Sequence, residues 1–295
     1  MHNISYNFGI IGASGYIAPR HLKAIKDNNS NLIIACDKSD SVGIIDNYFK
    51  NAYFCKSLKT LKKFIKNNKI DFLSICTPNN LHYSHAEFAL NHNIVPICEK
   101  PLVNNLQEAD QLINLKNKKN LDVFSISQLR YHKNVLSLKK RVQQDNKRNF
   151  VELIYFTPRG RWYENSWKFN QRISGGILNN IGIHLFDMLR FIFGSYNHSS
   201  IIYKSKKKIS GFSKFEYADV NWTLSIDCYS KDPYITDPSR PLRLMKINNK
   251  KFEFDSGFSD LHSISYSEII NGRGIGIEDT YETLKIIHDI NKLKK

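Results

Sequence analysis

The sequence predicts two domains, a doubly wound α/β nucleotide-binding domain followed by an α+β domain. A chain of 295 residues is long enough for two hydrophobic cores. In its first part, short apolar runs alternate with helical patterns, which is typical of a parallel sheet covered on both faces. In its second part, strand-like runs and long helices are grouped instead, which favours a mostly antiparallel open sheet with separate helices. We place the boundary near residues 126–131, giving domains of residues 1–126 and 127–295.

The elements of the first domain follow from apolar runs and from helix-capping residues. Strands are expected at residues 8–11, 32–36, 72–76, 94–98 and 123–126, where the runs are short and often β-branched. Ser57 is positioned to cap a helix that contains Leu58 and Leu61, and Asn104 with Gln107 to begin a later one. Between these two, a further helix is expected to contain Leu81, Phe88 and Leu90.

The second domain has a different order of patterns. Strands are expected at residues 150–157, 201–204, 220–229, 243–247 and 251–255. Long helices are expected at residues 175–194, 260–274 and 277–292. This order, strands and helices without regular alternation, predicts the α+β domain.

Charge and cysteine content restrict the kinds of partner. The chain has 43 Lys and Arg against 27 Asp and Glu, a formal charge of +16, but the basic residues are scattered over helix faces. We therefore expect no nucleic-acid partner, and a general attraction for anionic small molecules. The five cysteines have no metal-ligand spacing, so we expect no metal and a reducing compartment. Without a long apolar run we expect no membrane partner and a cytoplasmic protein.

The stretch "GIIGASGYIA" predicts a dinucleotide site. A strand leads into Gly12, Ala13, Ser14 and Gly15, and a helix follows, so that unpaired N–H groups and the positive end of the helix dipole can face a pyrophosphate. Asp37 ends the next strand about 20 residues further on, where a carboxylate accepts the hydroxyls of the adenosine ribose. A carboxylate repels a 2′-phosphate, so NAD is favoured over NADP. A merely structural turn is the alternative for the glycines alone.

Polar residues follow two further strands, in "CTPNNLH" and "CEKP". Ligands of open α/β sheets bind outside the carboxyl ends of the strands, so we expect Thr77, Asn79, His82, Glu99 and Lys100 to line one crevice. Lys100 is expected to point to the place where a substrate meets the nicotinamide.

The second domain supplies a histidine and a cluster of cations. In "NNIGIHLFDML", Asn180 and His184 lie one helical turn apart, away from an apolar stripe, although a core histidine is the plainer interpretation of His184. A histidine and a lysine in one cleft suit alcohol oxidation, which requires a base and a donor to the developing alkoxide. The run "RGRWYENSWK" places arginine, lysine and aromatic side chains together, which suits a sugar or base ring with an anionic group, or an ordinary surface strand end.

Together these motifs resemble the Gfo/Idh/MocA oxidoreductases. Within them, the stretches "GASGYIAPRHLKAIKD", "SICTPNNLHYSHA", "ICEKPLV", "RGRWYENSWK", "NNIGIHLFDMLRFIFG" and "GFSDLHSISYSEIINGRGIGIED" resemble one branch, the bacterial UDP-N-acetylglucosaminuronate 3-dehydrogenases of surface-polysaccharide pathways. The resemblance extends from about residue 7 to 290. The chain departs from the family in its glycine turn, G-x-x-G-x-x-A, and in Asn180, where many members have Asp.

The resemblance implies NAD-dependent oxidation of the C3 hydroxyl of a UDP-linked sugar acid to the 3-keto sugar, in lipopolysaccharide or O-antigen biosynthesis. It implies that Lys100 and His184 are the catalytic pair. Either can take the proton, and we favour His184 as base with Lys100 as donor to the C3 oxygen. The expected substrate-binding residues are Lys100, Arg159, Tyr163, Lys168, Asn179, Asn180 and His184. The expected NAD-binding residues are Gly12, Ser14, Gly15, Tyr16, Ile17, Asp37, Ser39, Thr77, Asn79, Leu81, His82, Glu99, Lys100, Gln128 and Trp162.

Three other interpretations remain open at this level. Within the same family, the second interpretation is a dehydrogenase of another sugar or polyol, since "EKP" alone indicates only the family. Outside the enzymes, the alternatives are a non-catalytic NAD-binding regulator or partner protein and a basic nucleic-acid binder. The resemblance also implies a homo-oligomer, a dimer or tetramer, formed through the open face of the second domain's sheet.

Overall fold

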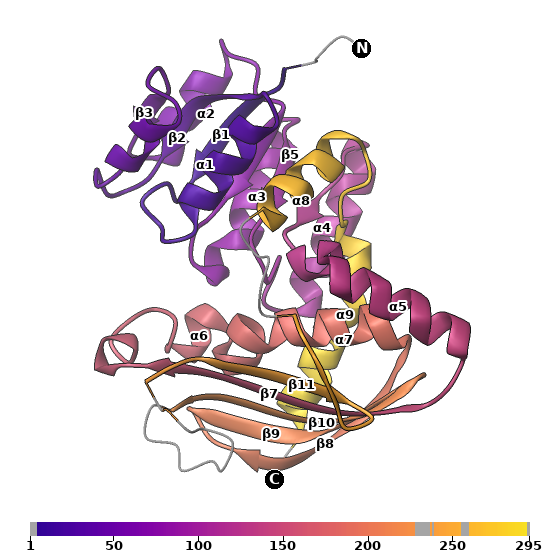
Figure 1. Cartoon of the computed structure of the whole chain (residues 1–295). Helices are drawn as coiled ribbons and strands as arrows, with labels where there is room; N and C mark the ends of the chain where they lie inside the picture. Colours follow the sequence, from indigo (N-terminus) through magenta and orange to yellow (C-terminus); the bar gives the residue numbers. More distant parts are fainter. Residues whose placement is uncertain (1–4, 228–236, 238, 255–259, 294–295) are drawn as a thin grey trace. The chain divides into compact units, whose positions relative to one another are not determined.

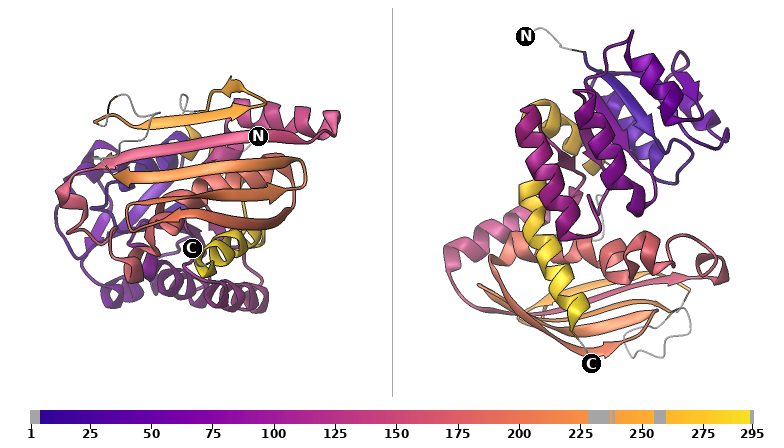
Figure 2. Two further views of the ribbon diagram at one scale, coloured as in Figure 1. Left: turned by 90° about the horizontal axis from the view of Figure 1, so that it is seen from below. Right: turned by 180° about the vertical axis from the view of Figure 1, so that it is seen from behind.

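A computed structural model describes residues 5–227, 237, 239–254 and 260–293. The chain forms two compact units (Figures 1 and 2). Unit 1 consists of Met1–Gln128 and Ser259–Tyr281, and unit 2 of Leu129–Phe258 and Glu282–Lys295. Among the described residues, no helix combines the length and apolar character that a membrane crossing requires.

Unit 1 is built on a six-stranded parallel sheet with the order β3-β2-β1-β4-β5-β6. This is the order of a dinucleotide-binding fold, in which the first strand lies at the point where the chain changes direction. The strands are β1 (Asn7–Ile11), β2 (Asn31–Cys36), β3 (Tyr53–Cys55), β4 (Phe72–Ile75), β5 (Val95–Cys98) and β6 (Phe124–Ser125). The predicted fold of the first domain is confirmed, although the short β3 was not predicted.

The helices of unit 1 cover this sheet (Figure 1). They are α1 (Ala18–Asp27), α2 (Leu58–Ile65), α3 (His82–Asn91) and α4 (Leu106–Lys119), with short 3₁₀ turns at Gly43–Asn47 and Asn79–Leu81. Ser57 caps α2 as predicted, since its side chain accepts from the Thr60 N–H. The cap of α4 is Asn105, one residue later than predicted, because its side chain accepts from the Glu108 N–H while the Asn104 N–H donates to the Glu108 carboxylate.

A segment from late in the sequence completes unit 1. Helix α8 (Leu261–Ile270) packs against α1, and its Tyr266 ring stacks on Phe8 of β1 with centroids 5.6 Å apart. The predicted division at residue 126 into two continuous stretches does not include this return. The reason is physical: Tyr266 and Ile269 are part of the same buried core as Phe8, Leu22 and Ile25.

Unit 2 contains a six-stranded sheet with the order β12-β11-β7-β10-β9-β8 (Figure 2). Among the described strands of this sheet, only β7 and β10 pair in parallel, and the other neighbouring strands are antiparallel. The predicted mostly antiparallel sheet is therefore confirmed. The strands are β7 (Asn149–Arg159), β8 (Tyr196–Lys204), β9 (Lys208–Phe215), β10 (Ala218–Asp227), β11 (Leu242–Ile247) and β12 (Lys250–Phe252). Strand β9 was not predicted, and the predicted strand ends at residues 228–229 and 255 lie outside the described residues.

Helices cover one face of this sheet (Figure 1). Trp222 of β10 meets Phe186 of α7 edge to face at 5.2 Å, which anchors α7 (Ile183–Phe193) to the sheet. The turn before α7, Leu178–Gly182, is π-helical. The remaining helices are α5 (Lys133–Asp145), α6 (Gln171–Ser174) and α9 (Ile277–Lys292), with 3₁₀ turns at Gln128–Tyr131 and Arg161–Tyr163.

Candidate active site

The glycine turn after β1 has a backbone that requires glycine at its first position. Gly12 has φ +85°, and a Cβ there would lie 2.7 Å from the backbone carbon of Cys76. Ile17, the residue before α1, supplies no side-chain cap to the helix start. The turn therefore brings main chain close to the end of β4 and leads directly into a helix N-terminus, a geometry suited to a pyrophosphate.

Asp37 and Ser14 connect the ends of β1 and β2. The Ser14 N–H donates to Asp37 Oδ2 at 2.9 Å, and the Ser14 hydroxyl donates to the same oxygen at 2.8 Å. The Ser39 N–H donates to Asp37 Oδ1 at 2.9 Å. The structure thus brings three of the predicted cofactor residues into one hydrogen-bonded group, with the carboxylate at the carboxyl end of β2.

The strand-end residues Thr77 and His82 lie beside the loop that carries Lys100. His82 Nδ1 is 2.7 Å from the Pro101 carbonyl oxygen, and its Nε2 is 2.8 Å from the Thr77 carbonyl oxygen. Burial lowers the pKa of His82, and a neutral imidazole has one N–H, so His82 donates to one of these carbonyls at a time. This geometry favours a role for His82 in holding the loop. The peptide bond between Lys100 and Pro101 is cis.

Glu99 is buried beneath Lys100 and is held by two histidines. Its Oε1 lies 3.0 Å from His21 Nε2 and 3.1 Å from His262 Nε2. Its Oε2 accepts the Lys100 N–H at 3.2 Å. Neither His21 nor His262 was predicted as a functional residue. The sequence signals for this group are the position of His21 on a predicted helix and the "EKP" motif that contains Glu99. Neither signal indicates a contact with residue 262, because His262 is far away in the sequence.

In unit 2, four of the predicted substrate residues form one group around Tyr163. Asn180 Nδ2 donates to the Tyr163 hydroxyl at 3.0 Å, and the Arg159 guanidinium lies 5.7 Å from the Tyr163 ring centroid. The Nε atom of Arg159 is buried without a hydrogen-bond partner among the described residues. Burial, and then the positive charge of Arg159, lower the pKa of Lys168. Two cations in a partly buried place favour the binding of an anion.

The other predicted unit 2 residues lie near this group or on the adjoining helix. Trp162 is 57 % exposed, and its ring meets Tyr163 edge to face at 5.6 Å. Asn179 and Asn180 occupy the π-helical turn, a feature often found at functional sites, with Asn179 buried and Asn180 half-buried. His184 is half-buried on α7. Lys100 belongs to unit 1 and His184 to unit 2, and their catalytic roles stay predictions.

The remaining predicted cofactor residues belong to unit 1 and differ in exposure. Tyr16 is 84 % exposed, whereas Asn79 and Gln128 are buried. Half-buried positions are taken by Gly15, Ile17 and Leu81. All of these roles stay predictions.

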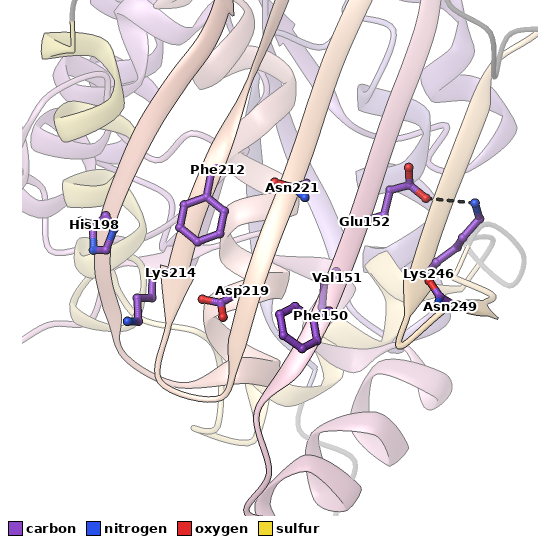
Figure 3. Close-up of a pocket in the computed structure, with 10 residues that line it drawn as sticks. All are labelled: Phe150, Val151, Glu152, His198, Phe212, Lys214, Asp219, Asn221, Lys246 and Asn249. Atoms are coloured by element: carbon purple, nitrogen blue, oxygen red, sulfur yellow. Dashed lines mark ion pairs between the residues drawn. The ribbon is translucent and has the colours of Figure 1, made fainter.

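The sheet of unit 2 has two faces, and Figure 3 shows the one opposite the face that packs on α7. A shallow groove on it is lined by Phe150 and Glu152 of β7, Phe212 and Lys214 of β9, and Asn221 of β10, among other residues. Glu152 pairs with Lys246 at 3.0 Å across the strands. Most lining residues are polar, but Phe150 is 69 % exposed.

The residues of unit 1 fit NAD. The glycine required at position 12, the uncapped start of α1 and the carboxylate at the end of β2 are the three features a dinucleotide uses in this fold. Asp37 accepts donors through both oxygens, which keeps the carboxylate in place at the strand end.

Comparison with known proteins places both units in one family. A model described as "Oxidoreductase family, NAD-binding Rossmann fold" (GFO_IDH_MocA) matches residues 6–126. A second, "Oxidoreductase family, C-terminal alpha/beta domain", matches residues 150–219. The chain spans about half the length of the first curated relatives it matches, 57 %, 41 % and 50 % of each. A further curated relative is a glucose-6-phosphate 3-dehydrogenase of Bacillus subtilis, 27 % identical over 198 residues, which cover 63 % of this chain and 53 % of the relative.

Solved structures match over nearly the full chain. The WlbA (WbpB) dehydrogenase of Thermus thermophilus, in complex with NAD and alpha-ketoglutarate, is 34 % identical with a TM-score of 0.93, covering 98 % of this chain and 96 % of that one. The same dehydrogenase with NAD and UDP-GlcNAcA gives a TM-score of 0.92 at 34 % identity, covering 98 % and 95 %. The WlbA dehydrogenase of Bordetella pertussis, at 18 % identity and a TM-score of 0.80 over 98 % and 95 %, shares the fold.

Proposed function

The chain belongs to the Gfo/Idh/MocA oxidoreductase family, and from this premise we propose that it oxidises the C3 hydroxyl of UDP-N-acetylglucosaminuronic acid with NAD. The observation that carries the proposal is the match of both units to a dehydrogenase crystallised with NAD and UDP-GlcNAcA, at 34 % identity. The groups around Asp37 and Tyr163 are independent support, since one suits a dinucleotide and the other an anionic ring.

The proposed reaction removes a hydride from C3 and a proton from its hydroxyl, leaving a ketone. NAD, when bound, supplies the hydride acceptor. His184 takes the hydroxyl proton, and Lys100 donates a hydrogen bond to the oxygen as negative charge develops on it.

The carboxylate at C6 of the sugar is proposed to bind near Arg159 and Lys168. The Arg159 guanidinium lies over the Tyr163 ring, and burial, followed by the charge of Arg159, lowers the pKa of Lys168. An anion beside these two cations is therefore favoured on electrostatic grounds. Asn180 donates a hydrogen bond to the Tyr163 hydroxyl and carries no charge of its own. We assign the orientation of the sugar to Tyr163 and Asn180, and the recognition of its charge to the two cations.

A mass measurement tests the proposal. The purified protein is incubated with UDP-N-acetylglucosaminuronate, NAD and 2-oxoglutarate, the last to reoxidise NADH. We expect a UDP-sugar lighter by two hydrogens, and no such product from Lys100→Ala. UDP-N-acetylglucosamine, which lacks the carboxylate, is the matched substrate control and should react far more slowly. Full activity on that control, or on an unactivated sugar such as glucose 6-phosphate in place of the UDP-sugar, would contradict the substrate assignment.

Three finer statements belong to the same proposal. We propose that the reaction serves a surface polysaccharide and takes place in the cytoplasm, where UDP-sugars are made. We also propose that a second copy of the chain covers the open sheet face of unit 2, because Phe150, which lines the groove on that face, is 69 % exposed. Light scattering on the intact protein measures the assembly, and Phe150→Lys should reduce it to a monomer.

A further inference from the structure

A buried polar cluster connects three elements of unit 1 beneath Lys100. We call the side chains of His21, Glu99 and His262 the His–Glu–His cluster; they are 0 %, 7 % and 2 % exposed. His21 comes from α1, Glu99 from the residue after β5, and His262 from α8. Both imidazoles approach the same carboxylate oxygen, at 3.0 and 3.1 Å. A buried carboxylate is costly unless donors surround it, so this convergence is a specific arrangement.

The chemistry of the groups fixes the direction of these hydrogen bonds. An ionised carboxylate only accepts, so the Nε2 atom of each histidine carries the hydrogen. Nδ1 of neutral His21 then accepts from the Tyr266 hydroxyl at 2.7 Å, and the Tyr266 oxygen is 2.6 Å from the Ser74 hydroxyl, which donates to it. Every donor in this chain of bonds points towards Glu99. The cluster therefore stabilises the charged form of Glu99.

The charge of Glu99 is set by its surroundings. The hydrogen bonds from His21 and His262 outweigh burial and hold the pKa of Glu99 well below its usual range, while burial lowers the pKa of His21. The other titratable groups that face Glu99 are Cys76 after β4, Cys98 of β5, His82 of α3, Tyr266 of α8 and the neighbouring Lys100.

The cluster is directly connected to the loop that carries Lys100. Glu99 Oε2 accepts the Lys100 N–H at 3.2 Å, so the carboxylate fixes the main chain at the residue proposed to be catalytic. On the other side, His82 Nδ1 lies 2.7 Å from the Pro101 carbonyl oxygen. The loop is thus held from both ends by buried side chains, and the stem of Lys100 begins between these two attachments.

We propose that His21, Glu99 and His262 are positioning residues for Lys100. The two imidazoles orient the carboxylate and stabilise its charged form, and the carboxylate orients the Lys100 main chain. The proposal rests on the catalytic role given to Lys100 above. It also gives α8 a function, since this late segment returns to unit 1 and supplies one of the two donors.

The same three side chains also lie close enough to ligate a metal ion, with their ligand atoms within 4.8 Å of one another. We favour hydrogen bonds because both Nε2 atoms lie at hydrogen-bond distance from one oxygen, and because the other oxygen accepts a main-chain N–H. Metal content is therefore a necessary control in the test.

The test compares two amides at position 262. The amide nitrogen of Gln reaches the place of a histidine Nε2, whereas that of Asn stops about one bond short. His262→Gln therefore keeps the donor to Glu99, and His262→Asn removes it. Ile269→Ala, buried on the same helix, is the control for lost packing without a lost donor. For each variant kcat, KM for the UDP-sugar and the pH profile of kcat are measured, with zinc content by elemental analysis and Lys100→Ala as reference.

For His262→Asn we expect kcat to fall by about tenfold to a hundredfold, as for other small misplacements of a reacting group, with KM within about twofold. The acid limb of its pH profile should move to higher pH, because Glu99 with one donor fewer is protonated more easily. His262→Gln and Ile269→Ala should keep the profile of the unchanged protein.

Each other outcome has a defined meaning. An unchanged protein that does not oxidise the UDP-sugar contradicts the proposed function. If it is active and Lys100→Ala is not, then equal kcat and equal pH profiles for the Asn and Gln variants overturn the positioning role. A stoichiometric metal that is lost in His262→Asn also overturns it, in favour of a metal site.

Discussion

The charge of Asp37 should decide between NAD and NADP, and Asp37→Asn isolates that charge. The carboxylate accepts from the Ser14 N–H, the Ser14 hydroxyl and the Ser39 N–H, all at 2.8 to 2.9 Å. Asn has the same shape and keeps one oxygen as acceptor. The substitution therefore removes a negative charge and one acceptor while it leaves the turn largely held.

The expected changes in affinity for NAD and NADP follow from two energies, the hydrogen bonds to Asp37 and the repulsion of the 2′-phosphate. Hydrogen bonds to a charged group contribute about 1.5–3 kcal/mol and neutral ones about 0.5–1.5, so NAD should bind about tenfold more weakly to the variant. For NADP, the repulsion between a carboxylate and a 2′-phosphate about 4 Å away is about 1 kcal/mol per unit charge in water. This repulsion is absent in Asp37→Asn, because the amide carries no charge. Since the phosphate carries nearly two charges, the ratio of NADP to NAD affinity should rise about a hundredfold or more.

Calorimetric titration of the intact protein with each dinucleotide measures both affinities. Ser14→Ala is the matched control, because it removes one donor to Asp37 and leaves the charge; it should change NAD affinity by about twofold and give no gain for NADP. The gain of Asp37→Asn should shrink in high salt, since Asp37 is only half-buried and salt screens exposed charges. A ratio of affinities that stays within twofold of the unchanged protein would refute the assignment of Asp37 to the adenosine ribose.

Four further substitutions have defined outcomes. Gly12→Ala should destabilise unit 1 by at least about 1–3 kcal/mol and abolish NAD binding in calorimetry, because φ is +85° and a Cβ would lie 2.7 Å from main chain. Arg130→Met should lower the free energy of unfolding by about 3–5 kcal/mol, since Asp187 is then left buried without its ion pair. Adding Asp187→Leu should recover most of this loss. Tryptophan fluorescence during urea unfolding measures both free energies, because all three tryptophans lie in unit 2. Burial lowers the pKa of His85 from 6.5 to about 4, so the folded state is fully stable with respect to this group above pH 6.5 and loses stability as the pH falls. Between pH 7.5 and 5 the free energy of unfolding of His85→Gln should therefore fall by about 2 kcal/mol less than that of the unchanged protein. Urea unfolding followed by circular dichroism at each pH measures the difference. Lys168→Met should raise KM for the UDP-sugar acid about tenfold or more and leave KM for UDP-N-acetylglucosamine unchanged, in steady-state kinetics.

The sequence was sufficient for the features that local patterns determine. Alternation of apolar runs with helices predicted the parallel sheet. Ser14 and Asp37 were both assigned to the cofactor from their places after the first two strands, whereas the hydrogen bond between them was not predicted. Ser57 was identified as a cap because a cap depends on residues within one turn. The short strand β3 was not predicted, because its three residues, "YFC", are too few to show a periodic pattern.

Features that depend on distant residues could not be foreseen. His21 and Tyr266 are 245 positions apart, and no repeat or composition shift links α1 to α8. The boundary at residue 126 followed from the first change of pattern, whereas the second crossing of the chain into unit 1 is driven by burial of Tyr266 and Ile269. A hydrophobic helix face shows that it will be buried, but it does not show against which element.

The helix α7 shows how far residue spacing can be taken. Asn180, His184 and Asp187 lie at helical spacing, and a common face suggests a common task. In the structure Asp187 instead accepts the Arg130 guanidinium at 2.6 and 2.9 Å and the Thr283 hydroxyl at 3.0 Å, deep in unit 2, while Asn180 donates to Tyr163. The π-helical turn at Leu178–Gly182 contributes to this separation, because it adds a residue to the turn and rotates Asn180 relative to the α-helix that follows. One helix therefore serves two tasks: its start presents polar groups to the proposed sugar site, and the buried ion pair at Asp187 fixes the helix that carries His184.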